Sequence, residues 1–443
     1  MPFQDFKITK TGKKIFSILF MVIFAVAPLW DKVHAADAPY TYPKAPEVHS
    51  ETAILIEAET GQIIYAKNEN KRMEPASLTK IMTCLLAVEL WDGNEEDMVE
   101  VTSDGLFDID YESTTMELNV DEILPFPDLL YGLMLPSAND AANVISIYLA
   151  GEIEDYVEMM NARAAELKLT GTHFSNPHGL PSPTHYTTAY DLAMITREAI
   201  KNEQFLRFAG ASEHNIPENE WAEERNLVHT NRLMQPDHEL YYPGIIAGKT
   251  GWTRPAGHCL MTAAEKDGMT LICVVMKAGS AANEYSDTTG LLNYGFENFK
   301  KVNIDCTQYD NTSIEFIDSD GQQRRAILSL RERKFPAVVP NDAHGDMMAF
   351  SLPNIETVSD GAYEDALLGW SDAISGAPEQ PLRRVPVRVW VEKIKAANAE
   401  ADVSMEQENV ETERGSRNTA LLLGVAGVVI LAGSAWWRNR KNE

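Results

Sequence analysis

The spacing of hydrophobic and polar residues predicts alternating strands and helices in the first part of the chain. Two β-rich runs, 53–56 and 62–66, flank a turn and predict a β-hairpin. Residues 77–91 carry apolar side chains densely enough for a buried helix, and Pro75 stands just before its start. Strand-like and helix-like stretches alternate to about residue 297, which indicates a first domain that mixes both kinds of element.

Three consecutive strands are predicted near the end of this domain. The strand-like runs cover residues 242–251, 257–264 and 269–277. The dipeptide Asp267-Gly268 between the last two runs is a strong signal for a tight hairpin turn. The three strands are therefore expected to pair antiparallel, one after another.

A second, strand-rich region is predicted from about 298 to 396. Residues 313–317 and 385–391 alternate apolar and polar side chains, and a further strand-like run, 325–330, follows the turn residues 318–321. Residues 360–376 are expected to form a helical insert in this region.

Both ends of the chain contain an apolar segment. A lysine-rich stretch, the apolar run 15–29 and small residues follow one another, which predicts a secretory signal peptide over residues 1–35, with an uncleaved anchor helix as the alternative. After a polar, acidic linker (397–418), residues 419–437 carry no charge and are long enough to cross a bilayer core of about 30 Å. The basic tail 438–443 is expected to stay in the cytoplasm, which places the body of the protein outside.

Composition narrows the possible partners. The chain has 443 residues, 44% of them hydrophobic, which is ample for two domains with real cores. Its net charge of −28 argues against nucleic acid as a partner.

Four cysteines are too few for a scaffold built on disulfides; one bridge is possible, but its pairing cannot be assigned. No Cys/His spacing indicates a metal site.

Three short motifs carry the candidate chemistry: Ser77-Leu78-Thr79-Lys80, Ser137-Ala138-Asn139 and Lys249-Thr250-Gly251. Each is weak alone, because such short patterns also occur by chance. Their order, spacing and local contexts make the set specific. Together they offer a nucleophile, candidate bases, an amide that can hold substrate and a cationic strand edge.

The first motif is predicted at the start of a helix. Ser77 would lie where free backbone N–H groups and the positive end of the helix dipole gather. Lys80 follows one turn later on the same face, so its amine can reach the Ser77 hydroxyl. The alternative is a plain N-cap serine with an exposed lysine.

The other two motifs are predicted in a turn and on a strand. A turn between two helices would expose Ser137 and Asn139, although simple capping of the second helix is an alternative. On the strand, Lys249 and Gly251 would share one face and Thr250 the other, while Gly251 would let a substrate backbone approach closely. The alternative is an ordinary strand end with an exposed lysine.

On these motifs the chain resembles a low-molecular-mass penicillin-binding protein, the serine-type D-alanyl-D-alanine carboxypeptidase. The stretches 172–180, 188–193 and 229–233 add to the resemblance. It implies an α/β (α+β) catalytic domain over 36–297, with an antiparallel sheet and a helical subdomain like that of the β-lactamases. It also implies a small β-sandwich domain over 298–396.

The resemblance further implies roles for individual residues. Ser77 would be the acylated nucleophile and Lys80 its base, which must be neutral to accept a proton. Lys249 could be the second cation that lowers the pKa of Lys80. Ser137 would relay a proton to the leaving D-alanine amine, and Asn139 would hold the substrate's peptide amide.

The substrate's terminal carboxylate would bind on the third motif. Lys249 and Thr250 would receive it, and Arg232 is a further candidate, with a plain surface arginine as the alternative. The backbone N–H groups of Ser77 and Trp252 would form the oxyanion hole. No cofactor is needed. The expected partners are peptidoglycan stem peptides, β-lactams as covalent inhibitors, and the membrane through the C-terminal helix.

Rival functions on the same fold are a class A-like β-lactamase, a DD-endopeptidase or transpeptidase, and a non-catalytic wall-binding protein. A class A β-lactamase would place a glutamate to activate the deacylating water. Glu166 partly matches the sequence signature around that glutamate, but Thr170 stands where the signature has asparagine. Residues around 160–166 are expected to be helical, which predicts that Glu166 lies on a helix surface.

Overall fold

The computed structural model describes residues 42–107, 109, 113–307, 310–317, 321–343, 348–351, 363–372 and 383–393. The predicted signal peptide, the linker and the C-terminal apolar segment lie outside these ranges. Within them, no helix combines the length and the apolar character needed to cross a membrane.

A five-stranded antiparallel sheet forms the centre of the first domain, in the order β2-β1-β9-β8-β7. Its strands are β1 (Thr52–Glu57), β2 (Ile63–Lys67), β7 (Ile245–Thr253), β8 (Gly257–Lys266) and β9 (Met269–Ala278). The first strand pairs with the last, and the register joins Thr52 to Met276. The centre of the sheet is therefore formed by strands from opposite ends of the domain's sequence.

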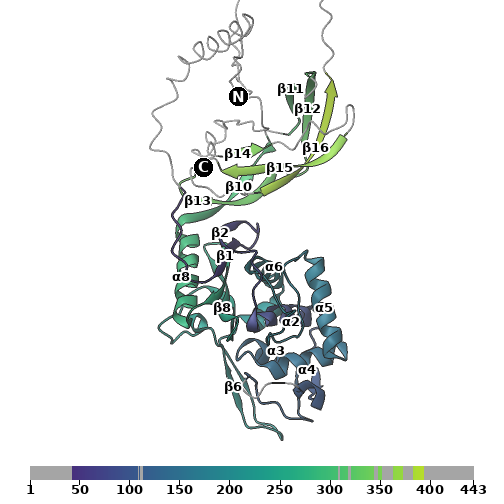
Figure 1. The fold of residues 1–443 in the computed structure, drawn as a ribbon, viewed down its shortest axis with the longest axis vertical. Coiled ribbons are helices and arrows are strands. Elements are labelled where there is room, and N and C mark those ends of the chain that lie inside the picture. Colours follow the sequence, from purple (N-terminus) through teal and green to yellow (C-terminus); the bar gives the residue numbers. More distant parts are fainter. Residues whose placement is uncertain are drawn as a thin grey trace, which may run out of the picture. The chain divides into compact units, whose positions relative to one another are not determined.

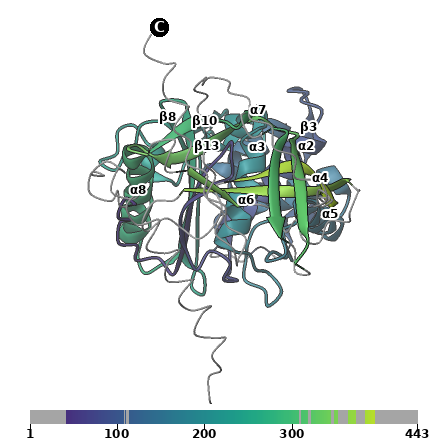
Figure 2. The same ribbon diagram turned by 90° about the horizontal axis from the view of Figure 1, so that it is seen from above.

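Helices cover both faces of this sheet (Figure 1). α8 (Ala281–Asn298) packs on β8 and β9 from one side, and the remaining helices gather on the other (Figure 2). These are α2 (Lys80–Leu90), α3 (Phe126–Met134), α4 (Asn139–Ala150), α5 (Ile153–Glu166), α6 (Ala189–Ala199) and α7 (Glu203–Ala209). The main hydrophobic core lies between the sheet and this helical group, where Ile54, Leu85 and Val274 are all buried.

Short elements link the larger ones. Two small antiparallel sheets join β3 (Met98–Glu100) to β4 (Ile123–Pro125) and β5 (Glu213–Ile216) to β6 (Arg225–Val228). The 3₁₀ turns are η2 (Ala76–Thr79), η3 (Ser103–Leu106) and η4 (Arg232–Met234).

The predicted hairpin and the three consecutive strands are confirmed. β1 pairs with β2, and β7, β8 and β9 pair in succession. Asp267 and Gly268 both have positive φ, 52° and 75°, as the two-residue turn requires. The long helix α8 was not predicted.

The helix predicted over 77–91 is divided in the structure. Residues 76–79 form the 3₁₀ turn η2, and the α-helix α2 begins only at Lys80. Ala76 has a φ of +48°, which turns the chain sharply just before Ser77. The predicted helix is thus confirmed over 80–90, and Ser77 lies at its N-terminal end as expected, but in a 3₁₀ turn that leads into the α-helix.

The region after α8 is strand-rich, as predicted. β10 (Phe299–Asp305) pairs with β13 (Lys334–Pro340), and a five-stranded antiparallel sheet has the order β11-β12-β16-β15-β14. Its strands are β11 (Thr312–Ile317), β12 (Gln323–Leu330), β14 (Met348–Ser351), β15 (Tyr363–Asp372) and β16 (Arg383–Lys393).

The predicted helical insert around 360–376 is wrong where the structure describes it. Residues 363–372 are the strand β15, which pairs with β16 on one side and β14 on the other. β16 pairs with residues 363–370 and β14 with residues 369–372, so the backbone of the segment is hydrogen-bonded as a strand along its whole length.

All four cysteines are buried and free. The possible disulfide is therefore not formed in the structure.

Candidate active site

The Lys80 amine lies at the meeting point of three segments. Its Nζ is 3.2 Å from Ser77 Oγ, 2.6 Å from Asn139 Oδ1 and 2.8 Å from the backbone oxygen of His178. Because Lys80 begins α2 and Asn139 begins α4, two helix starts and one loop converge on a single amine. The structure thus brings the first two motifs together.

Burial makes this amine unusual. Lys80 is 0% exposed, and its pKa is lowered well below the usual lysine range, first by burial and then by the charge of Lys249; Asp140 opposes the shift. Burial also lowers the pKa of Lys249 to about 7. Two buried lysines that share one region favour a neutral form of Lys80 near neutral pH.

Ser137 and Asn139 are buried, and the prediction that the turn exposes them was wrong. They are 7% and 4% exposed because the turn folds inward, toward Lys80. Ser137 has a φ of +73°, and its buried hydroxyl has no hydrogen-bond partner within the described ranges. Neither side chain caps α4, whose N-cap residue is Ala138. Asp140 instead accepts hydrogen bonds from the backbone N–H groups of Met116 and Leu118.

The third motif lies on β7, directly beside Ser77. Lys249 and Gly251 are buried, whereas Thr250 is partly exposed, as the predicted alternation requires. A Cβ atom added to Gly251 would lie 3.1 Å from the Ser77 nitrogen, so the β7 backbone packs closely on the turn of the nucleophile. Lys249 Nζ donates to the Thr250 carbonyl oxygen at 2.9 Å.

The outer rim of this strand is more open. Trp252 is 61% exposed. The Thr250 hydroxyl lies 2.6 Å from the Thr230 hydroxyl. Arg232, in η4, has an exposed side chain, and its backbone N–H donates to the Tyr285 hydroxyl at 3.4 Å. Arg232 therefore follows Thr230, which contacts Thr250, by two residues along the chain. Its exposed side chain is not part of the buried cluster around Lys80.

Sequence reasoning assigned no role to several groups at this site. The His178 carbonyl and the Thr230 hydroxyl lie in the stretches 172–180 and 229–233. Both stretches supported the resemblance to the family, but no residue in either was predicted to contact Lys80 or Thr250. A backbone carbonyl leaves no trace in a residue pattern, so only the fold could identify the contact at His178.

The loose β-lactamase signature is not realised. Glu166 is the last residue of α5, its side chain is 67% exposed, and it forms an ion pair of 3.1 Å with Arg163. The prediction that it lies on a helix surface is confirmed. Within the ranges that the structure describes, no group of His, Cys, Asp and Glu side chains could hold a metal ion.

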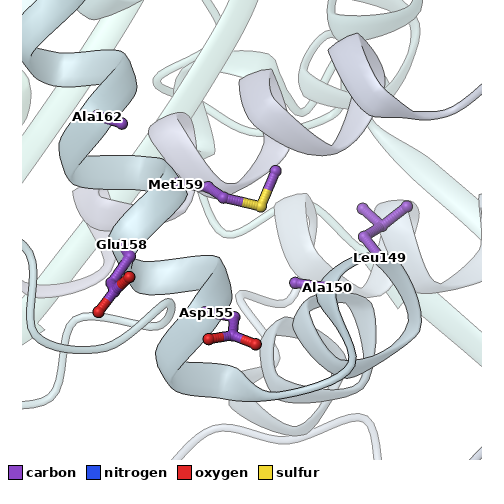
Figure 3. A pocket seen from close by; sticks show the side chains of 6 residues that line it. All are labelled: Leu149, Ala150, Asp155, Glu158, Met159 and Ala162. Atoms are coloured by element: carbon purple, nitrogen blue, oxygen red, sulfur yellow. The ribbon is translucent and has the colours of Figure 1, made fainter.

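A separate surface hollow lies where α4 ends and α5 begins (Figure 3). It is lined by Leu149, Ala150, Asp155, Glu158, Met159 and Ala162. None of the motif residues lines it, so it is distinct from the site around Ser77.

Comparison with known proteins identifies the family of the chain. The family described as D-alanyl-D-alanine carboxypeptidase matches residues 40–280. The carboxypeptidase DacF of Bacillus subtilis is 34% identical over 57% of this chain and 63% of its own length. The carboxypeptidase DacD of Escherichia coli is 34% identical over 61% of this chain and 69% of its own length. The chain thus spans about two thirds of these relatives.

Solved structures show the same fold. The DacD carboxypeptidase of Francisella tularensis superposes with a TM-score of 0.63 at 21% identity, over 81% of this chain and 98% of that one. The Streptomyces K15 DD-transpeptidase gives 0.54 at 27% identity, over 58% of this chain and 100% of that one. The fold is thus that of penicillin-binding proteins and β-lactamases, and the chain belongs to the D-alanyl-D-alanine carboxypeptidase family.

Proposed function

We propose that the chain is a serine DD-carboxypeptidase that removes the terminal D-alanine from peptidoglycan stem peptides through an acyl-enzyme on Ser77. One observation carries this proposal. A neutral lysine amine has two N–H bonds and one lone pair. Asn139 Oδ1 and the His178 oxygen, at 2.6 and 2.8 Å, can accept both N–H groups. The lone pair is then left for the Ser77 hydroxyl at 3.2 Å, as a general base requires.

Acylation follows from this arrangement. The Ser77 oxygen bonds to the carbonyl carbon of the penultimate D-alanine while its proton passes to Lys80 Nζ. The backbone N–H groups of Ser77 and Trp252 are proposed to stabilise the resulting oxyanion. The close packing of Gly251 on the Ser77 turn supports this pairing, since it brings the two backbones together.

The leaving group then departs. The C–N bond to the terminal D-alanine breaks, and its amine takes a proton that Lys80 returns through the Ser137 hydroxyl. The unpartnered, buried oxygen of Ser137 supports this role, because a relay must be able to exchange partners. Water next attacks the ester carbonyl and gives up a proton to Lys80. The Ser77 oxygen leaves and takes that proton back, which frees the enzyme.

Substrate binding is proposed along β7. The terminal carboxylate would bind to Lys249 and the Thr250 hydroxyl, and Arg232 would add long-range attraction. The amide nitrogen of Asn139 would hold the substrate's peptide carbonyl, since its oxygen already bonds Lys80. A demand for a free carboxylate explains why such an enzyme trims chain ends.

Location and anchoring are proposed from the sequence alone. The signal peptide and the segment 419–437 favour an enzyme exported across the cell membrane and held at its outer face. The β-rich region (298–396), proposed as a β-sandwich domain, would act as a spacer that lifts the catalytic domain toward the wall.

Incubation of the purified full-length protein with a pentapeptide ending in D-Ala-D-Ala, followed by mass analysis, tests the activity. Release of a single alanine is expected, with no release by Ser77→Ala. An intact peptide together with turnover of a β-lactam would instead assign the chain as a β-lactamase.

A second measurement separates hydrolysis from transfer. The same incubation with an added amine acceptor would yield a cross-linked product if the chain is a transpeptidase. A fluorescent penicillin should label Ser77 in either case. Absence of labelling would favour the non-catalytic wall-binding protein.

A further inference from the structure

We propose that His185 and Thr79 are positioning residues that fix the turn of the nucleophile by holding the carbonyl of Ala76. This inference rests on the proposed function of Ser77, but its geometry is independent of the substrate. Both residues are buried: His185 is 2% exposed and Thr79 is 0% exposed.

The turn before the nucleophile needs such support. Ala76 has a φ of +48°, a conformation that residues with a Cβ atom rarely adopt. Such a conformation persists only where the surroundings over-determine it, and it tends to occur at active sites. Whatever fixes the Ala76 carbonyl also fixes the peptide plane that leads into Ser77.

A directed chain of hydrogen bonds reaches this carbonyl. The Ser175 backbone N–H donates to His185 Nδ1 at 3.0 Å, so this nitrogen carries no proton. The neutral ring then has its proton on Nε2 and donates to the Thr79 hydroxyl at 2.8 Å. The Thr79 hydroxyl in turn donates to the Ala76 oxygen at 2.8 Å. Each donor has one acceptor, so the chain has a single direction.

The neutral state of His185 is secured by its surroundings. Burial, together with the charges of the nearby His173 and Lys80, lowers the pKa of His185 to about 4. The ring of Phe174 meets the imidazole edge-on, with the centroids 5.8 Å apart. The imidazole is thus held in one tautomer and one orientation.

The same loop also contacts the base. The His178 carbonyl accepts from Lys80 Nζ, and Gly179, with a φ of +96°, lies so close that a Cβ atom there would stand 1.9 Å from the Ala76 oxygen. The loop therefore holds the nucleophile turn through His185 and the base through His178. Misplacement of reacting groups by about 1 Å can cost on the order of 100-fold in rate.

Substitution of Thr79 tests the proposal. Thr79→Val removes the hydroxyl at nearly constant volume, and we expect about a 10- to 100-fold slower acylation by a fluorescent penicillin, and a similar fall in kcat with little change in KM. Thr79→Ser keeps the hydroxyl and should restore the rate to within about 3-fold. His185→Phe should act like Thr79→Val, because it also leaves the chain of hydrogen bonds broken.

A matched control separates positioning from general stability. Thr196 is also fully buried, and its hydroxyl donates to the Leu192 carbonyl at 2.8 Å inside α6. Thr196→Val should lower the Tm to a similar extent with an unchanged acylation rate. Equal acylation rates for Thr79→Val and Thr196→Val would overturn the proposal.

Crystal structures test the same point without catalysis. In Thr79→Val we expect the Ala76 carbonyl to rotate and Ser77 Oγ to move away from Lys80 Nζ, relative to the wild type. An unchanged turn would refute the inference. If the wild-type protein itself fails to react with penicillin, the proposed function is wrong, and this structural comparison still decides the role of His185 and Thr79. If Thr79→Val does not fold, His185→Phe is compared with the wild type in its place, with the same two outcomes, and Thr79→Ser serves as the variant in which the turn should stay unchanged.

Discussion

Replacement of Ser137 by alanine should stabilise the protein while it slows catalysis. The Ser137 hydroxyl is buried and has no hydrogen-bond partner within the described ranges. A buried polar group without a partner costs roughly 1–3 kcal/mol. Ser137→Ala removes that oxygen and keeps the backbone φ of +73°, so the gain in the free energy of unfolding should be about 1–2 kcal/mol. In a domain of this size that corresponds to a rise in Tm of about 2–4 °C for each kcal/mol.

A neighbouring serine provides the control. Ser146 is also fully buried, but its hydroxyl donates to the Ala142 carbonyl at 2.7 Å within α4. Ser146→Ala should therefore be neutral or destabilising, with unchanged activity. Both variants are compared by urea unfolding and by the rate of D-alanine release, which should fall on the order of 100-fold or more in Ser137→Ala. A Ser137→Ala protein that is less stable than the wild type would show that the hydroxyl is satisfied in solution, and the reasoning would fail.

Three further substitutions follow from burial and from backbone conformation. With a folded pKa of about 7 against about 10.5 unfolded, the Lys249 charge destabilises the fold below pH 7 by about 5 kcal/mol, and this penalty fades as pH rises to 10.5. Lys249→Met should therefore be more stable than the wild type at pH 6, by a margin that shrinks toward pH 10 in urea unfolding; a constant margin would contradict this. Burial raises the pKa of Glu284 to about 8, so wild-type stability should fall between about pH 4.5 and 8, and Glu284→Gln should lack that fall in the same series. Gly179→Ala should lower the free energy of unfolding by on the order of 3 kcal/mol, because the added Cβ meets the Ala76 oxygen. Gly93→Ala is the control: Gly93 has a φ of +84° but open space around it, so the loss should be only about 1 kcal/mol. Similar losses for the two variants in urea unfolding would argue against the clash.

Elements with strong local signals could be predicted from the sequence. β8 and β9 are short, largely apolar runs that are buried along most of their length, and the Asp267-Gly268 turn between them fixes how they pair. Residues 360–376 were predicted to form a helical insert, but residues 363–372 are a strand because they pair with the distant strands β14 and β16. Where an element depends on distant partners, local pattern is not sufficient.

The residue types of the site could be predicted, but not their environment. Ser77, Lys80 and Asn139 were identified from their motifs, and the structure brings them within hydrogen-bonding distance. The sequence did not predict that the Ser137 turn folds inward or that Ala76 has a positive φ, because both depend on contacts with distant parts of the chain. Sequence motifs therefore identify the reacting side chains, whereas the packing around them sets how exposed they are and whether they are charged.

The pairing of β1 with β9 has a consequence for how activity first appears. Because Thr52 pairs with Met276, β1 keeps an open edge on that side until almost the whole catalytic domain has been made. Closing so long a loop is slow compared with forming the helices between them. β7, which carries Lys249, is also synthesised late, shortly before β9. A nascent chain that stops before β9 should therefore not react with penicillin, so covalent labelling reports the completion of the domain and can time its maturation during synthesis.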